Sequence, residues 1–202
     1  MELLIILVIV VAVAGYGVVL YNRLVTLRNT YRNAYKQIDV ALKQRHDMIP
    51  ALVETVKGYA AHEKETLNAV IEARNSAENL RAQASQSAQS SGQSPDGETI
   101  AKLSQAEGTL GSALGRLFAL SEAYPDLKAD QTFLNLMEEI STMEQRVAAS
   151  RRGYNNTVLE YNNTVQTVPS NFIANMFAFK TAQELEFEDR DAIQQMPKVS
   201  FT

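Results

Sequence analysis

The side chains of this 202-residue chain that are best suited to chemistry lie in one polar stretch, residues 43–47. Arg45 falls where the apolar stripe of a helix should pass, and a buried guanidinium needs a carboxylate on a facing helix. Lys43, Arg45 and His46 could instead form a polar interface for a partner or for a second copy of the chain. His46 and Asp47 could act as a proton relay, although an exposed pair near a helix end explains them more simply.

Recognised catalytic and metal-binding patterns are missing from the sequence. His62-Glu63 begins like the helix of a zinc protease, but Thr66 stands where the second histidine is needed. Several glutamates would suit a di-iron carboxylate site in a helix bundle, but the Glu-x-x-His pattern of such sites does not occur. There is also no glycine-rich phosphate loop and no nucleophile elbow. We therefore expect no catalytic residue, no cofactor and no metal, and predict that the protein is not an enzyme.

Composition narrows the class of protein further. The net charge of -4 gives no basic face for nucleic acid. The chain has no cysteine, which excludes disulfides, thiolate metal sites and a lipidated cysteine. Beyond the first twenty residues it is rich in alanine, leucine, glutamate and glutamine, which favour helices. The sequence predicts an all-α fold.

An uncharged apolar run covers residues 3–21. As a helix it is about 28 Å long, close to the roughly 30 Å hydrocarbon thickness of a bilayer. A cleaved signal peptide is the alternative, since Ala12-Val13-Ala14 resembles a cleavage site. Only Met1 and Glu2 precede the run, without a basic residue, and the run continues past that site. We predict a transmembrane anchor over residues 1–21 that contacts the lipid bilayer through residues 3–21.

The direction of the anchor follows from the charges beside it. Residues 22–45 carry six basic side chains and a single acid, Asp39. By the positive-inside rule, this places the soluble domain in the cytoplasm and the N-terminus outside. We expect a single-pass protein of the bacterial inner membrane.

The apolar stripe continues beyond the anchor without a loop signal. Spacings of three and four persist through residues 24–42, so the membrane helix should run on into the soluble domain as one rod. Pro50 either kinks this helix or opens a new one, and we favour the kink. Gly58 and residues 61–64 indicate a bend, after which a second stripe covers residues 67–80.

The rest of the domain, residues 22–189, reads as an antiparallel bundle of about four long helices. Residues 85–97 are rich in serine and glutamine, and we predict a flexible loop there. A third helix follows over residues 98–122, where three glycines at spacings of three and four suggest close approach to another helix. Asp130 is a suitable N-cap for the fourth helix, which should stop at Val168 before Pro169.

The fourth helix contains a seven-residue repeat, YNNTVLE-YNNTV. Tyr154 and Tyr161 occupy equivalent positions in it, as in coiled-coil packing. The asparagines beside them could hydrogen-bond across helices. We include both tyrosines in the candidate interaction surface.

After Pro169, Ser170 could cap a short C-terminal helix with a large apolar content. Phe172, Phe177 and Phe179 provide most of it. This segment could pack on the bundle, lie on the membrane surface, or dock on another protomer. The three phenylalanines complete the candidate interaction surface, and residues 190–202 should form a C-terminal tail.

Two stretches resemble the LemA family. The run QIDVALKQRHDMIPALVETVKGYAAHE, within residues 21–77, is the more specific, and YNNTVLEYNNTVQTVPSNFIANMFAFKTAQELEFED is similar to the second block of the family. Tyr35 stands where tryptophan is expected, and Ala178 where glycine is expected. The resemblance implies a single-pass membrane protein with a long-helix bundle. It implies no enzymatic activity, whereas some members look like components of magnetosome membranes.

Our leading hypothesis is a membrane-anchored helical scaffold that forms a homo-oligomer. The rod continuous with the anchor, the heptad face and the aromatic C-terminal segment motivate it. The alternative is an adaptor or signalling stalk that binds another membrane protein or a protease. An enzyme is the weakest hypothesis, since the sequence offers no reaction.

Overall fold

One helix, α1 (Glu2–Tyr59), runs through the full height of the molecule in the computed structural model. The structure describes residues 1–91 and 94–185. The side chains of the first part of α1 are exposed, with Leu3 at 85% and Val13 at 66%, and Leu24 is the first fully buried one. The predicted continuous rod is thus confirmed. Pro50 lies inside α1 and does not end it.

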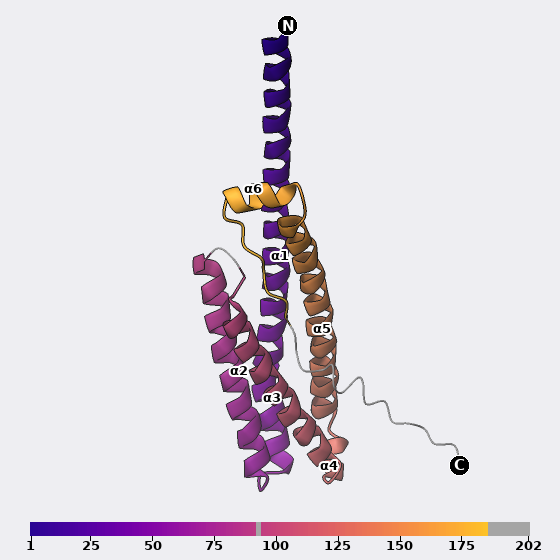
Figure 1. Cartoon of the computed structure of the whole chain (residues 1–202). Coiled ribbons are helices and arrows are strands. Elements are labelled where there is room, and N and C mark those ends of the chain that lie inside the picture. The colour runs from indigo at the N-terminus through magenta and orange to yellow at the C-terminus, as the bar shows by residue number, and fades with distance from the viewer. Residues whose placement is uncertain (92–93, 186–202) are drawn as a thin grey trace, which may run out of the picture.

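Three further long helices form the bundle with the lower part of α1. They are α2 (Lys64–Ser91), α3 (Gly97–Ser121) and α5 (Gln131–Gln166), and successive long helices run in opposite directions (Figure 1). Of these, α2 and α5 pack directly on α1, whereas α3 packs on α2. A four-residue helix, α4 (Pro125–Lys128), turns the chain into α5 at the end far from the N-terminus. No strand occurs in the described part of the chain. The predicted all-α fold with four long helices is confirmed.

The C-terminal helix α6 (Ser170–Met176) lies across α1, at the level where α1 leaves the bundle (Figure 1). Beyond α6 the chain turns at Ala178, whose φ of 53° lies in the left-handed region that favours glycine. An extended segment then follows α5 back toward the bundle. Glycine is the residue that the family resemblance implies at position 178, and this backbone conformation is the physical reason.

Two expectations about helix ends are confirmed, and one is wrong. The Asp130 carboxylate accepts a hydrogen bond from the Phe133 amide at 2.8 Å, as an N-cap should. The helix expected over residues 98–122 also forms, and Asp96 caps it through the Thr99 amide. Ser170 does not cap α6. Its hydroxyl donates instead to the Thr164 and Thr167 carbonyls at the end of α5.

The prediction of a flexible loop over residues 85–97 is mostly wrong. Residues 85–91 form the last turns of α2, and residues 92–93 lie outside the described residues. Ala84 is fully buried and Ala88 packs against the same cluster, so small side chains suffice for contact with α1 here. Alanine and glutamine also have good helix propensity, and the serines among them do not prevent the helix from forming.

The expected close approach at the three glycines of α3 is also wrong. A Cβ atom placed on Gly108, Gly111 or Gly115 would meet nothing within 4 Å. These glycines lie on a face of α3 that no other described element covers closely. Their face of the bundle is therefore open.

Candidate functional site

A layer of charged side chains divides the interior of the bundle between two hydrophobic clusters. The cluster nearer the exposed first part of α1 includes Leu42, Ala84, Leu103 and Val147, and the farther one includes Ile49, Ala77, Leu110 and Ile140. On α1, α2 and α3 the boundary between the clusters coincides with inward charged residues, and on α5 it coincides with the half-exposed Glu144. We call this set the polar layer: Asp39, Arg45, His46, Glu78, Arg81, Glu107 and Glu144.

Arg45 joins three helices within the polar layer. Its side chain is only 7% exposed and forms an ion pair with the buried Glu107 carboxylate of α3. Its other terminal nitrogen lies 3.2 Å from Glu144 of α5, which is half-exposed. The charge pair expected for Arg45 on a facing helix is confirmed. A buried guanidinium with two carboxylates has compensation for the hydration that it loses.

His46 is fully buried and points into the bundle. Its Nδ1 lies 2.8 Å from Glu78 Oε2, and its Nε2 lies 3.0 Å from Glu107 Oε1 without the alignment of a hydrogen bond. A neutral imidazole has one N–H, which it can donate to Glu78, whereas a second proton on Nε2 would add an ion pair with Glu107. The proposed pairing of His46 with Asp47 is wrong. Asp47 points outward and pairs with Lys43 at 2.7 Å.

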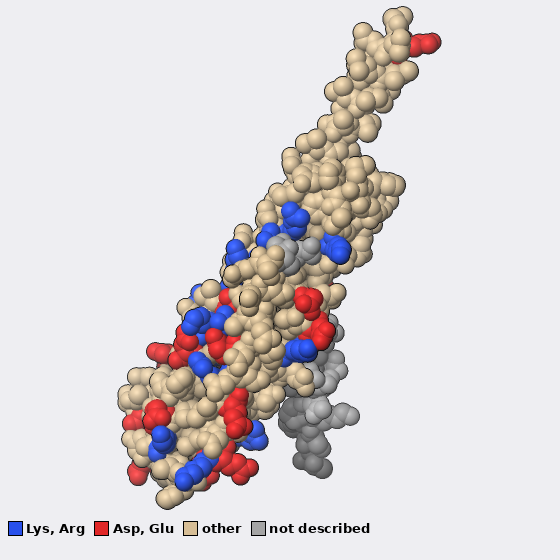
Figure 2. Space-filling view, turned by 90° about the vertical axis from the view of Figure 1, so that its left-hand side faces the viewer, with Lys and Arg blue, Asp and Glu red and all other residues tan. Residues whose placement is uncertain are grey.

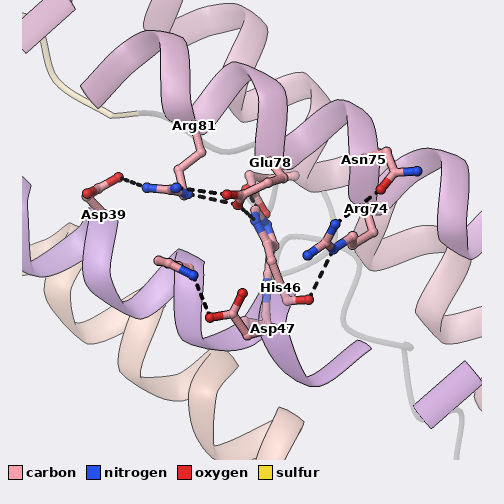
Figure 3. A network of polar contacts seen from close by, with 10 residues as sticks. Asp39, His46, Asp47, Arg74, Asn75, Glu78 and Arg81 are labelled. Carbon is pink, nitrogen blue, oxygen red and sulfur yellow. Dashed lines mark hydrogen bonds and ion pairs between the residues drawn. The ribbon is translucent and has the colours of Figure 1, made fainter. Parts of the chain in front are cut away.

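Arg81 closes the layer on the side of α2. Its guanidinium donates two hydrogen bonds to Glu78, at 2.8 and 2.9 Å, and one to Asp39 at 2.5 Å (Figure 3). The hydrogen bond from Arg81 is the main cause that lowers the pKa of Glu78 to about 2. The same bond raises the pKa of Arg81. Glu78 therefore stays ionised between Arg81 and His46 at neutral pH.

Pro50 explains the position of another arginine. A proline has no N–H, so the His46 carbonyl four residues earlier loses its usual helical donor. The Arg74 Nε of α2 donates to that carbonyl at 3.2 Å (Figure 3). The helix can therefore pass through Pro50 because a neighbouring helix satisfies the freed carbonyl.

The polar layer joins the helices to one another through ion pairs. Within residues 1–91 and 94–185, no group of three or more acidic or histidine side chains is arranged to hold a metal ion. The ion pairs instead link α1 to α2, α3 and α5 at one level, and a shifted helix would leave buried charges without partners. Sequence reasoning identified Arg45 but missed Glu78, Arg81 and Glu107. An acid or arginine within a helical apolar stripe was the available signal, as for Glu107 beside Leu103 and Leu110.

The heptad repeat of α5 holds the extended segment that follows α6. The Tyr154 and Tyr161 hydroxyls donate to the carbonyls of Gln183 and Lys180, at 2.7 and 2.8 Å. Both rings pack on tyrosines of α1, Tyr161 against Tyr31 at 4.9 Å between centroids. Burial raises the pKa of both hydroxyls to about 12, which keeps them protonated donors.

Two asparagines of the same repeat bind the segment through paired hydrogen bonds. Asn162 donates to the Ala182 carbonyl and accepts from the Ala182 amide, at 2.9 and 2.8 Å. Asn155 does the same with Leu185, at 3.0 and 2.9 Å. Seven helical residues rise about 10.5 Å, and three extended residues span about 10 Å, so the two spacings match. These amides bind extended backbone rather than another helix, contrary to the expectation. We call these two tyrosines and two asparagines the backbone clamp.

Seven of the eight predicted interaction residues therefore fall in three separate places, and Lys43 lies in none of them. Arg45 and His46 lie in the polar layer, Tyr154 and Tyr161 in the backbone clamp, and Phe172, Phe177 and Phe179 around α6, while Lys43 is exposed. Arg45, His46, Tyr154, Tyr161 and Phe179 are buried within the chain, so they are not available as a docking surface. Arg45, His46 and the two tyrosines each have a polar partner within the chain, and the Phe179 ring packs near Tyr21. Phe172 and Phe177 remain exposed, at 64% and 55%.

Comparison with known proteins agrees with this architecture. A sequence model of the LemA family matches residues 34–201. The chain belongs to the LemA family. It is 28% identical to Protein LemA of Metamycoplasma hominis over 177 residues, which cover 84% of this chain and 73% of that protein.

Two magnetosome proteins match a shorter region of this LemA family chain. Magnetosome protein MamQ 2 of Paramagnetospirillum magneticum is 37% identical over 78 residues, or 39% of this chain and 29% of that protein. Magnetosome protein MamQ of Magnetospirillum gryphiswaldense is 33% identical over 88 residues, or 44% of this chain and 32% of that protein. The matched regions thus span less than a third of these two relatives. The names of the family and of these relatives denote no enzyme.

Proposed function

We propose that this protein is a non-catalytic, membrane-anchored helical scaffold. The observation that carries the proposal is the single helix α1, which is bare over its apolar first part and forms core over the rest. Such an exposed apolar surface is favourable only in lipid or against another protein. Its length and composition suit a bilayer span.

A continuous helix would hold the bundle at a defined distance from the membrane. Residues 22–59 rise roughly 57 Å beyond the span, and no loop interrupts them. The polar layer and both hydrophobic clusters hold the other helices in place relative to α1. A rigid body at fixed height suits a protein that organises contacts near a membrane.

We place the soluble domain in the cytoplasm, with the span in the bacterial inner membrane and the N-terminus outside. Arg23, Arg28, Arg32 and Lys36 follow the span, and Asp39 is the first acid after it. A reporter fused after Thr202 tests this topology. Activity of a cytoplasmic reporter supports it, and activity of a reporter that works only outside the cytoplasm contradicts it.

Self-association is the second part of the proposal. The open glycine face of α3 allows the close approach of a helix from a second copy, and Gly15 in the span has free space as well. A different membrane protein could use the same surfaces, which would make the protein an adaptor. The relatives named as magnetosome proteins motivate both versions of the proposal.

The glycine face permits a sharp test in full-length protein, because substitution there meets no neighbour within the chain. We expect Gly108→Gln/Gly115→Gln to fold normally, since glycine costs about 1 kcal/mol relative to good helix formers. Mass photometry in detergent should detect oligomers of the parent protein and a monomer for the variant. Gly153→Gln on α5, where a Cβ also meets nothing within 4 Å, is the matched control. A strictly monomeric parent contradicts self-association, and crosslinking in native membranes to a different protein would support the adaptor version.

A further inference from the structure

The chain around α6 exposes a group of large apolar side chains on one end of the bundle. Val168 is 72% exposed, Phe172 64%, Met176 74% and Phe177 55%. We call these four residues the apolar collar. A short helix normally turns such residues inward, and α6 buries only Ser170 and Ala174. The collar therefore needs an apolar environment outside the chain.

The collar is fixed to the end of the proposed span. The Ile173 side chain of α6 lies 3.7 Å from the position of a Cβ on Gly17. The Phe177 ring packs on Tyr21, with 4.7 Å between centroids. Figure 1 places α6 crosswise on α1 just where the bare part of α1 begins. If residues 3–21 cross a bilayer, α6 must lie at its surface.

Charges around the collar distinguish a lipid surface from a second protein copy. No acid occurs in residues 3–38 or 161–183, the segments that build this end of the molecule. Arg23 and Lys180 are exposed there, and the Arg28 guanidinium stacks over Phe179 at 5.0 Å from its centroid. On the face drawn in Figure 2, cations gather directly below an almost uncharged upper part. Apolar residues followed by cations match the order of acyl chains and anionic headgroups.

We propose that the apolar collar inserts into the outer part of the acyl layer on the side of the bundle, and that the cations below it bind anionic headgroups. The proposal rests on the proposed membrane anchorage and goes beyond it. A span alone lets the bundle tilt freely, whereas a second contact beside the span fixes its depth and tilt. The apolar collar thus holds the bundle perpendicular to the membrane surface.

Site-specific fluorescence quenching in the full chain tests the collar directly. The sequence has no cysteine, so Phe172→Cys, Val10→Cys and Ala119→Cys each give one labelling site. Each bimane-labelled protein is placed in vesicles of phosphatidylcholine with phosphatidylglycerol. Quenching is measured with nitroxide-bearing lipids and with aqueous iodide. We expect the label at 172 to be quenched by shallow nitroxides and severalfold less by iodide than the label at 119, which lies on the far part of α3.

The outcomes separate the collar from the anchor. A label at position 10 that lipid nitroxides do not quench would overturn the anchorage itself. If that label is quenched but position 172 is as open to iodide as position 119, the collar proposal is wrong and the anchor stands. A label at 172 that neither quencher reaches would mean that protein covers the collar, which also overturns the proposal. Equal lipid quenching at 172 in vesicles of phosphatidylcholine alone would overturn the role given to the cations.

Discussion

Arg45 carries a positive charge into the middle of the bundle, where Glu107 and Glu144 compensate it. Arg45→Met would leave the buried Glu107 carboxylate without this partner, which typically costs 3–5 kcal/mol. We expect Tm, followed by circular dichroism of the detergent-solubilised protein, to fall by roughly 10 °C. Lys43→Met is the matched control, because the Lys43–Asp47 pair is half-exposed and such pairs contribute about 0.5 kcal/mol. A loss equal to that of the control would show that the polar layer does not stabilise the fold.

Glu78 makes the stability of the polar layer depend on pH. Its pKa is about 2 in the folded chain, below the ordinary value of 4.5, chiefly because Arg81 donates to it. A lowered pKa adds stability that is complete above about pH 5 and is lost as the pH falls from 4.5 toward 2. Glu78→Gln should therefore be less stable than the parent by about 2 kcal/mol at pH 7, with the gap closing near pH 2. Denaturation curves of both proteins from pH 7 to pH 2 check this, and a gap independent of pH would contradict it.

At the scale of elements, the backbone clamp should control the extended segment after α6 without affecting the helices. Asn155→Ala/Asn162→Ala removes both paired contacts, each worth about 1 kcal/mol. We expect hydrogen exchange of the Ala182 and Leu185 amides to accelerate roughly tenfold or more, because those amides donate to the two asparagines.

The same heptads supply the control for the clamp. Asn156 and Asn163 are the next residues along α5, and both are exposed. Asn156→Ala/Asn163→Ala should leave exchange at residues 182 and 185 unchanged. Equal acceleration in both double variants would mean that the segment is held by other contacts.

Most helices of this chain could be predicted from apolar spacing, since a buried stripe of leucines and isoleucines dominates the free energy of helix packing. The stretch at residues 85–91 was missed because alanines bury little area yet still pack closely against α1. The path of residues 178–185 was not predictable from local pattern, since it depends on distant amides of α5. Arg45 and its acidic partner could be foreseen because a charge interrupted a stripe, whereas the direction of His46 depended on Glu78 in another helix.

For the whole molecule, the proposed scaffold role depends on the apolar start of α1 remaining attached and embedded in lipid. The exposed first part of α1, the apolar collar and the cations around it lie in sequence along one axis, as a membrane and its surface require. The polar layer and the two hydrophobic clusters then connect the anchored helix α1 to the other helices of the bundle. A cleaved leader would leave the collar exposed to water with no span beside it.

Intact mass spectrometry of the protein from cells fractionated by alkaline carbonate washing tests this most directly. We predict that the protein stays with the membrane pellet as the full 22.4 kDa chain. A shorter chain without the opening residues, recovered from the aqueous fraction, would contradict the account.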